Sequence, residues 1–418
     1  MKGIYRYGIS IRDNYGCDSI TDSHKENSHI HALSKTISYY LNLGILPISD
    51  YFCAKIQRIP NINKLQMLQN EIKSSFVELG NFLRQFSLAK NTKDVTVLQN
   101  DTYYDDFIAL IELSQSHNGW FTPEQVQFSV QSWAKALTEE NLNQWLSNYD
   151  FSKTEPKKIG LILAGNIPLV GFHDFLSVLI SGHDVLVKTS SNDQHLLKFL
   201  AKYLITVEPK LNSKITFVEG KLEGFDAVIA TGSNNTARYF EYYFKEKRSI
   251  IRKNRNSVAV LNGMETFEDL VNLGEDIFRY FGLGCRNVSK LFVPKGYNFD
   301  NFFKAMYEYR DVIQYEKYAN NYDYNKAVFL MSNFQLLDNE FLTIKEDSSY
   351  SSPISSVFYE FYDGLEEIKN RLHTDAEQIQ CIVSKDLIPN SVAFGQTQQP
   401  KLWDYADNVD TLSFLISL

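Results

Sequence analysis

The alternation of apolar strands with amphipathic helices between residues 157 and 244 constrains the fold of this chain most strongly. The apolar segment "KKIGLILAGNIP" precedes the helical segment "LVGFHDFLSVLIS", and "DVLVK" precedes "QHLLKFLAKYL" in the same way. Strands that alternate with helices form a parallel sheet, because each parallel crossover needs a helix. Continuously apolar strands are typical of a sheet that is buried on both faces. The sequence therefore predicts an α/β domain here, whose helices begin at capping residues such as those of "TSSND".

A second α/β region follows. A helix over "FEDLVNLGEDIFRYF" leads into a glycine-rich loop and then into the strand "KLFVP". Three further segments have the composition of strands: "KAVFLM", "SSVFYEFY" and "IQCIV". The sequence thus predicts a second α/β domain that ends near residue 395, and a tail that forms a closing strand.

These patterns give four expected segments. We expect an extension at 1–66, a helical lead-in and cofactor-binding domain at 67–260, a catalytic domain at 261–395, and a C-terminal closing segment at 396–418. A chain of 418 residues exceeds one ordinary core, which agrees with two domains.

Residues 1–66 differ in pattern from the rest, since they sustain no long helical period. At Met67 an amphipathic helix, "MLQNEIKSSFVELGNFLRQF", begins at once. Two interpretations stay open: either Met67 is the true start and 1–66 is a non-native or poorly ordered extension, or 1–66 is a genuine arm packed on the body.

Composition excludes several classes of protein. The formal net charge of −8 argues against a nucleic-acid-binding protein, which needs a basic surface. The four cysteines are scattered without metal-type spacing, which indicates free thiols in a reducing cytosol and no metal site. Neither a secretory leader nor an apolar run of about 18 residues is seen, so we expect a cytoplasmic protein without a membrane span.

The segment "YFGLGCRNVSK" contains the strongest candidate for a reactive group, Cys285. A buried structural cysteine prefers apolar neighbours, whereas this one lies between Gly284 and Arg286. Glycine lets backbone amides approach a substrate closely, and positive charge from Arg286 or Lys290 would favour the thiolate. The alternative is a loop cysteine without a role.

Polar residues follow three of the strands in the first α/β region. Asn166 lies in the loop "AGNIP", Lys188 ends "DVLVK" next to Ser190, and the segment Thr231–Ser233 opens a helix. Ligands of open parallel sheets bind at the carboxyl ends of strands, and helix N-termini favour phosphates. Ordinary turn and capping chemistry explains the same residues, and the dinucleotide fingerprint GxGxxG is absent.

A basic run, "FKEKRSIIRKNRNS", stands out on an acidic chain. It has two interpretations: a site for the phosphates of CoA or a dinucleotide, or a solvated helix end.

Four segments together resemble the aldehyde dehydrogenase superfamily. They are "ILAGNIP", "VLVKTSSND", "ATGSNNTARYF" and "GLGCRNVSKLFVP". More narrowly, residues from 67 to the C-terminus resemble the acyl-CoA reductases related to the fatty-acid reductase of bacterial luminescence. The resemblance implies an aldehyde-dehydrogenase-like α/β fold, with a Rossmann-like cofactor domain beside a catalytic α/β domain.

The resemblance also implies site roles. Cys285 would be the nucleophile, and Asn166 with the Cys285 backbone N–H would form the oxyanion hole. Lys188 would contact the adenosine ribose or its 2′-phosphate, with Ser190 beside it. The pyrophosphate would be held by Gly232 and Ser233, next to Thr231. The implied cofactor is NADPH, with NADH as the alternative.

One departure from the wider superfamily bears on the reaction. Hydrolytic members carry a water-activating glutamate upstream of the cysteine, and the corresponding segment "KNRNSVAVLNG" has no acid. This favours an acyl-CoA or acyl-carrier-protein thioester reductase of fatty acid metabolism that releases an aldehyde. Two alternatives stay open: reduction of an acyl phosphate or semialdehyde, and non-redox acyl transfer by the cysteine. An oligomer is compatible with the sequence.

Overall fold

The computed structural model describes the backbone of residues 50–418 and the side chains from Met67 onward. Most of the expected extension, with Cys17, lies outside the described residues, so neither interpretation of residues 1–66 is tested. The helix expected to begin at Met67 begins earlier, since α2 spans Asp50–Leu83. The chain forms two compact units, residues 1–63 and 64–418, and the second holds both sheets.

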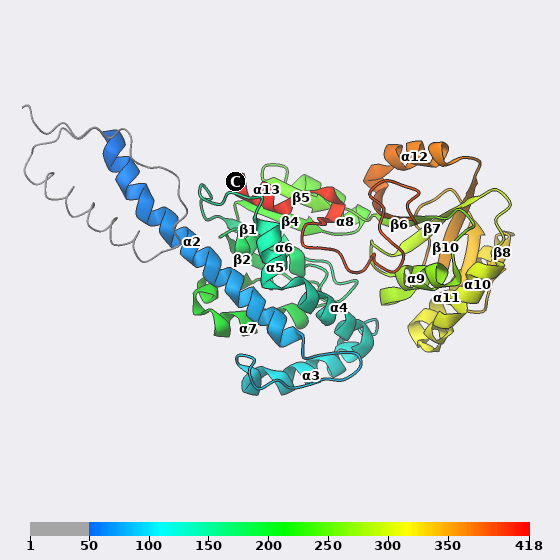
Figure 1. The fold of residues 1–418 in the computed structure, drawn as a ribbon, viewed down its shortest axis with the longest axis horizontal. Coiled ribbons are helices and arrows are strands. Elements are labelled where there is room, and N and C mark those ends of the chain that lie inside the picture. Colours follow the sequence, from blue (N-terminus) through cyan, green and yellow to red (C-terminus); the bar gives the residue numbers. More distant parts are fainter. Residues whose placement is uncertain (1–49) are drawn as a thin grey trace, which may run out of the picture. The chain divides into compact units, whose positions relative to one another are not determined.

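The first sheet is the predicted parallel sheet. Its strands are β1 (Lys158–Ile162), β2 (Asp184–Lys188), β3 (Ile215–Phe217), β4 (Ala227–Thr231) and β5 (Arg248–Arg252). Their spatial order is β3-β2-β1-β4-β5, and every pairing is parallel. Chain order reverses at β1, which pairs with both β2 and β4 (Figure 1). An open sheet offers a ligand crevice at such a reversal, outside the carboxyl ends of the strands.

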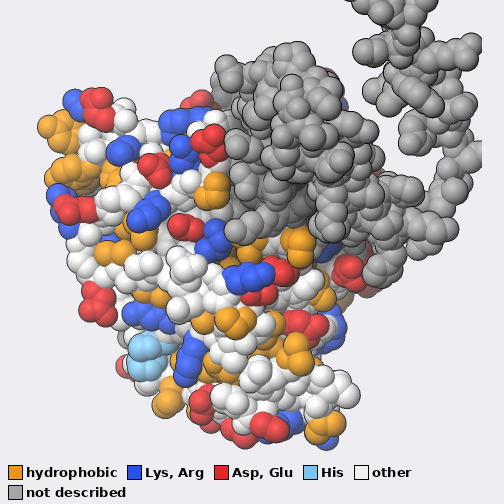
Figure 2. All heavy atoms as spheres, turned by 90° about the vertical axis from the view of Figure 1, so that its left-hand side faces the viewer, with side chains coloured by type: hydrophobic (Ala, Val, Ile, Leu, Met, Phe, Trp, Pro, Cys, Tyr) orange, Lys and Arg blue, Asp and Glu red, His pale blue; other side chains and the backbone are white. Residues whose placement is uncertain are grey.

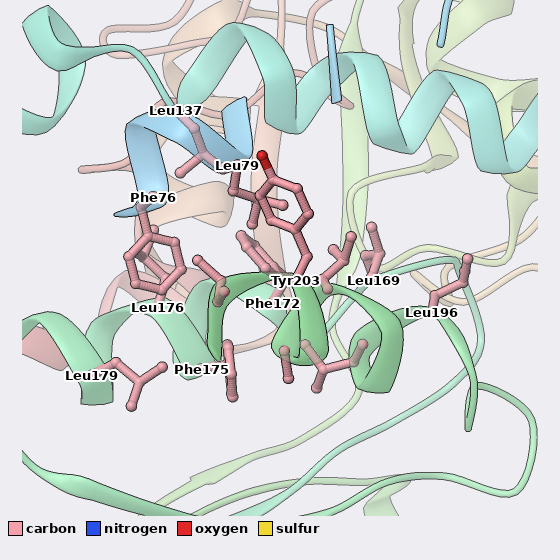
Figure 3. Packing of buried hydrophobic residues seen from close by; sticks show 14 of the residues in the cluster. Phe76, Leu79, Leu137, Leu169, Phe172, Phe175, Leu176, Leu179, Leu196 and Tyr203 are labelled. Carbon is pink, nitrogen blue, oxygen red and sulfur yellow. The ribbon is translucent and has the colours of Figure 1, made fainter. Parts of the chain in front are cut away.

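Helices cover both faces of this sheet. On one face, α6 (Phe172–Ile180) and α7 (Leu196–Val207) share a buried cluster with β1 and β2. Figure 3 shows residues of α2, α6 and α7 meeting in this cluster, with Leu169 among them. The other face is covered by α8 (Asn234–Tyr243), whose Phe240 packs on Val228 and Ala230.

The predicted cap of α7 is wrong. His195 occupies the N-cap position and makes no side-chain capping bond. Within "TSSND", the Asp193 carboxylate accepts the Leu169 N–H at 3.0 Å and the Ser190 hydroxyl accepts the Asn192 N–H at 3.2 Å.

The lead-in to the first sheet is helical. Its helices are α3 (Asn100–His117), α4 (Pro123–Ala136) and α5 (Glu139–Leu146). Thr122 caps α4 and Thr138 caps α5, each by accepting a backbone N–H bond. Buried residues of these helices join the core of the first sheet, so the lead-in belongs to the same body.

The second sheet begins directly after the first. Its strands are β6 (Asn256–Val260), β7 (Val288–Pro294), β8 (Leu336–Asp338), β9 (Thr343–Glu346), β10 (Ser356–Tyr362) and β11 (Ile379–Val383). Their order is β11-β6-β7-β10-β9-β8, parallel except for the β8–β9 pair. The change of sheet therefore lies between Arg252 and Asn256, a few residues before the domain boundary expected at residue 260.

Helices flank this sheet as well. Clusters of buried residues place α9 (Phe267–Phe278), α10 (Asp300–Met306) and α11 (Glu316–Met331) in one core and α12 (Leu365–Thr374) in another (Figure 1).

The strand expected at "KAVFLM" is wrong, because these residues end α11. Tyr318, Tyr322 and Phe329 lie three to four residues apart, or multiples of that, and are buried on one face of the helix. No Gly or Pro interrupts the helix, so it continues through the apolar run and leaves Met331 exposed.

The closing strand expected in the tail is also wrong. The tail forms a 3₁₀ turn at Ala406–Asn408 and the helix α13 (Thr411–Ile416). Asp410 caps α13 by accepting the Ser413 N–H at 2.9 Å. Leu412 and Leu415 are buried in the core of the first sheet, and a capped helix achieves this burial without a strand partner.

The surface is mixed in charge. On the face in Figure 2, basic and acidic side chains are interspersed with hydrophobic ones, and no continuous basic surface is visible there. Over the part of the chain that the structure describes, no helix combines the length and apolar character needed to cross a bilayer. The same residues contain no group of three or more His, Cys, Asp or Glu side chains arranged to hold a metal.

Candidate active site

The carboxyl edge of the first sheet brings together the polar residues predicted from the strand ends. Ile162 pairs with both Lys188 and Ala230 in register, so β1, β2 and β4 end side by side. The Leu163 N–H donates to the Lys188 carbonyl at 3.0 Å. The loop of Asn166 therefore lies between Lys188 on one side and Thr231 on the other.

Lys188 is half-buried, and its ammonium group donates to the Gly220 carbonyl at 2.9 Å. Ser190 follows in a loop that touches the Asn166 loop directly. A Cβ atom on Gly165 would lie 2.7 Å from the Ser190 Cβ and Oγ atoms, so only glycine fits there. Asn166 itself is exposed.

Thr231, Gly232 and Ser233 lead into α8. The Ser233 hydroxyl accepts the Thr236 N–H at 3.3 Å and caps the helix, which is ten residues long. A Cβ atom on Gly232 would lie 3.0 Å from Thr236, so this turn is also close-packed. Ser233 is exposed at a helix N-terminus, which suits a phosphate. The donors at this edge therefore fit a dinucleotide.

The cysteine loop follows α9 through a strained turn. Tyr280 and Phe281 have φ values of 54° and 58°, a left-handed conformation that costs a non-glycine residue roughly 1–3 kcal/mol. The side chain of Asn287 stabilises the turn. It donates to the Asp276 carbonyl at 3.0 Å and to the Arg279 carbonyl at 2.8 Å. Its own oxygen accepts the Gly284 N–H at 2.8 Å.

Cys285 lies at the end of this loop and is half-buried. Its carbonyl accepts the Ser257 hydroxyl at 3.0 Å, and the same hydroxyl lies 3.0 Å from the Cys381 Sγ atom. The Cys285 backbone N–H has no hydrogen-bond partner within residues 50–418. It is thus available to an oxygen on the substrate.

Burial raises the pKa of the Cys285 thiol to about 11, although the Arg286 guanidinium acts in the opposite direction. The expectation that Lys290 also favours the thiolate is wrong. Lys290 is fully buried and pairs with Glu360 and the Asp347 carbonyl, because β7 turns its side chain into the core around α12. The resting thiol is therefore protonated at neutral pH.

Asn166 and the cysteine loop meet. The Asn166 Nδ2 atom donates to the Leu283 carbonyl at 2.8 Å, across the two sheets of the second unit. An amide nitrogen carries two hydrogens, so one remains for another acceptor. The structure thus brings the predicted donor to within two residues of the predicted nucleophile.

Sequence reasoning missed a third segment of the site, at residues 395–398. Asp276 accepts the Gly395 N–H at 2.7 Å and the Thr397 N–H at 3.0 Å, and Arg286 donates to the Thr397 carbonyl at 2.5 Å. Gln398 comes next, with only 7% of its surface exposed. Its Nε2 atom has no partner among the described residues. The polar run "GQTQQP" was the signal available, but nothing in it indicates contact with the neighbours of Cys285.

One end of the basic run lies at the carboxyl edge, since Arg252 pairs with Thr231 in register and its carbonyl accepts the Gly232 N–H at 3.2 Å. The cations of the run contact groups of the same chain. The pairs are Lys245–Glu246, Lys253–Glu241, Arg252–Asp174 and Arg255–Asp407, with Lys247 on the Phe225 carbonyl and Arg248 on the Ser417 carbonyl. Both interpretations of the run stay open.

The fold defines the class of protein first. The chain is similar to aldehyde dehydrogenase 21 of Physcomitrella patens, solved with the product succinate, at 12% identity over 84% of both chains and a TM-score of 0.58. It is also similar to indole-3-acetaldehyde dehydrogenase of P. syringae, solved with NAD⁺, at 12% identity over 75% of this chain and 71% of that one, with a TM-score of 0.51. The predicted aldehyde-dehydrogenase-like fold is thus confirmed.

The sequence then defines the family. Residues 81–316, more than half of the chain, match the acyl-CoA reductase (LuxC) family, so the chain belongs to it. A curated relative is long-chain acyl-protein thioester reductase 2 of Photobacterium leiognathi, 21% identical over 319 residues. That match covers 69% of this chain and 65% of the relative's length. The predicted resemblance is confirmed.

Proposed function

We propose that this chain reduces an acyl thioester to an aldehyde through an acyl group carried on Cys285. The observation that supports this most is the contact of Asn166 with the cysteine loop at Leu283. This contact brings the Asn166 amide to a carbonyl two residues before Cys285, and a tetrahedral oxyanion needs two convergent donors, for which we propose this amide and the Cys285 backbone N–H. In this proposal the first sheet belongs to the cofactor domain and the second sheet to the catalytic domain.

In the first half-reaction, the Cys285 sulfur loses its proton and attacks the thioester carbonyl carbon. The carbonyl oxygen becomes an oxyanion, which accepts hydrogen bonds from the Cys285 N–H and the second Nδ2 hydrogen of Asn166. The bond from carbon to the leaving thiol then breaks. The leaving thiolate takes up a proton, and the acyl group remains on Cys285.

A reduced nicotinamide dinucleotide, when bound, supplies the hydride. We propose NADPH, with NADH as the alternative, and we assign its phosphates to Gly232 and Ser233 at the start of α8. Lys188, with Ser190 and Thr231 nearby, would bind the adenosine ribose or its 2′-phosphate.

In the second half-reaction, the acyl carbon becomes bonded to hydrogen and its oxygen is again held by Asn166 and the Cys285 N–H. The carbon–sulfur bond then breaks, the aldehyde leaves, and the Cys285 sulfur is protonated again.

We propose that the acyl-enzyme is not hydrolysed, because the segment "KNRNSVAVLNG" lacks the glutamate that activates water in hydrolytic members of the superfamily. Asp407 acts on Cys285 through its charge and lies 3.2 Å from the Arg255 guanidinium, and burial raises its pKa. In this proposal the acyl group persists on Cys285 until it is reduced or returned to a thiol.

The proposed donor is a fatty acyl group on CoA or on a carrier protein, and the relative named as an acyl-protein thioester reductase supports the latter. We also propose a cytoplasmic location, which the unpaired Cys285 and Cys381 support. Acyl phosphate reduction and non-redox acyl transfer are the alternatives that the following experiment separates.

The test is intact-protein mass after incubation with acyl-CoA, without a dinucleotide. We expect a gain of one acyl group in the wild type and none in Cys285→Ser. NADPH oxidation is then followed with acyl-CoA, acyl-carrier protein and acyl phosphate in parallel. Oxidation with acyl phosphate alone would replace the thioester assignment, and a mass gain without NADPH oxidation by any donor would indicate an acyltransferase.

A further inference from the structure

Two loops of the first sheet are joined by one buried carboxylate. The Asn166 loop follows β1, and the loop that carries Ser190 and Asp193 follows the neighbouring strand β2. The Asp193 Oδ2 atom accepts the Leu169 N–H at 3.0 Å. This bond connects the segment that carries the proposed oxyanion donor to the loop that carries proposed cofactor residues.

Leu169 needs such a restraint. Its φ of 58° is left-handed, which costs a residue with a Cβ atom roughly 1–3 kcal/mol unless its surroundings hold it there. Its side chain is 98% buried among residues of α6 and α7 (Figure 3), since 2% of its surface is exposed. Ser129 restrains the preceding residue by donating to the Pro168 carbonyl at 2.9 Å. The backbone just after Asn166 is thus fixed at both Pro168 and Leu169.

The two loops also touch just before Asn166. A Cβ atom on Gly165 would lie 3.1 Å from the Asp193 backbone nitrogen. Asn166 is therefore exposed at the tip of a loop that Asp193 contacts on both sides, at Gly165 and at Leu169.

Asp193 faces the first residue of α7 as well as Leu169. Only 9% of its surface is exposed. Burial raises its pKa to about 6, although the N–H groups of Leu169 and Leu196 stabilise the carboxylate. Its buried Oδ1 atom makes no close hydrogen bond among the described residues. Burying a carboxyl group costs stability, which indicates that it is kept for the arrangement that it enforces.

We propose that Asp193 is the positioning residue that holds Asn166 at the Cys285 loop; this inference rests on the proposed function. The carboxylate fixes Leu169, Leu169 fixes the loop, and the loop sets where the Asn166 amide points. Without the acceptor, the buried Leu169 N–H is unpaired and its left-handed backbone relaxes. A displacement of the order of 1 Å at such a donor costs about 10²-fold in rate.

The test compares Asp193→Ala, which removes the acceptor, with Asp193→Asn, which keeps one. We expect Asp193→Ala to slow the acyl mass gain on Cys285 by about 10- to 100-fold, less than or equal to the loss from deleting Asn166 itself. Asp193→Asn should restore most of the rate. Asp226→Ala is the matched control, because Asp226 accepts the Lys158 N–H at 2.8 Å at the opposite end of β1.

A double-mutant cycle separates positioning from a general structural role. In the Asn166→Ala background, Asp193→Ala should cause little further loss, because the group that it positions is gone. Full additivity would overturn the proposal, as would a wild-type acylation rate in Asp193→Ala.

Hydrogen exchange tests independently of activity whether Asp193 restrains the Leu169 backbone. In the wild type, the Leu169 amide should be the best protected of residues 164–170, and Asp193→Ala should lose this protection while Asp193→Asn keeps it. Should Asp193→Ala fail to fold, Asp193→Ser, whose hydroxyl is too short to reach Leu169, takes its place. An unprotected Leu169 amide in the wild type overturns the proposal, whereas a wild type that is never acylated overturns the proposed function.

Discussion

The carboxyl edge of the first sheet and the cysteine loop are built in opposite ways. At the edge, Lys188 ends β2 and donates to the Gly220 carbonyl, and Ser233 caps α8 through its contacts with Thr236. The cysteine loop is instead tied to three distant segments, at Asn166, Ser257 and Thr397. After their proposed roles, we call the carboxyl edge the cofactor half and the cysteine loop the acyl half. The cofactor half depends on contacts within the first α/β region and is open, whereas the acyl half depends on contacts from both sheets.

The strongest test of this difference removes the Cys285 sulfur. We expect Cys285→Ala to lower the rate of aldehyde formation by roughly 10³-fold or more, because no covalent acyl intermediate can form. Aldehyde release and intact-protein mass measure this. Cys381→Ala is the matched control, since its sulfur lies 3.0 Å from the same Ser257 hydroxyl that donates to the Cys285 carbonyl, but has no proposed role. Equal losses in both variants would contradict the assignment of Cys285.

The second test removes the donor that crosses between the two halves. Asn166→Ala should lower kcat for the thioester by about 10²–10³-fold, with a smaller change in KM, because the lost hydrogen bond forms mainly in the transition state. Steady-state kinetics measure the two constants separately. Asn192→Ala, an exposed asparagine of the adjacent loop, is the control. A rise in KM with unchanged kcat would assign Asn166 to ground-state binding.

The third test measures how strongly burial disfavours ionisation of the Cys285 thiol. With a pKa of about 11, the Cys285 thiol is mainly protonated below that pH, and its thiolate fraction rises about tenfold for each pH unit. Alkylation by iodoacetamide should therefore increase about 100-fold between pH 8 and pH 10, without a plateau. Peptide mapping locates the modified residue. The denatured chain is the control: its rate should reach half of its maximum near pH 8.5 and level off above about pH 9.5. The same levelling off in the native protein would contradict the burial of the thiol.

The smallest expected effect concerns the open half. Lys188→Ala should raise the Kd for NADPH by about tenfold, since one charge-assisted hydrogen bond contributes roughly 1.5 kcal/mol. Acylation of Cys285 in the absence of dinucleotide should stay within about twofold of the wild type. Calorimetry and the mass assay measure the two quantities. Lys295→Ala, an exposed lysine beyond β7, is the control. A matching loss of acylation would show that the two halves are not separable.

The sequence was informative where function follows local pattern. Asn166, Lys188 and Thr231 directly follow or end apolar segments, and strands of one parallel sheet end at the same edge. Their common location was therefore predictable from periodicity alone. The cysteine loop was recognisable from its glycines and from its place after a helix.

Other residues of the site carry no such local signal. Asp193 and Asp276 are acidic residues that are buried against backbone N–H groups far away in the sequence. Asn287 and Gln398 act through their contacts with the turn of the cysteine loop, at Arg279 and Gly284. Polar residues are ordinarily exposed, so sequence alone assigns all four to the surface.

The errors in secondary structure have a related cause. "KAVFLM" and "TLSFLI" are short apolar runs, for which strand and helix patterns cannot be distinguished by period. The first continues a helix in which Tyr318, Tyr322 and Phe329 already define the buried face, and the second begins at the cap supplied by Asp410. Tertiary context decided both.

The packing of the C-terminal tail has a consequence for how the protein is made. Trp145 donates to the Tyr405 hydroxyl at 2.7 Å, and His183 lies 3.0 Å from the Leu415 carbonyl. The first sheet therefore leaves the ribosome long before α13, which completes its hydrophobic cover. Contacts of such long sequence separation form slowly and leave apolar surface exposed in the meantime. The core around the first sheet can accordingly close only after α13 has been synthesised.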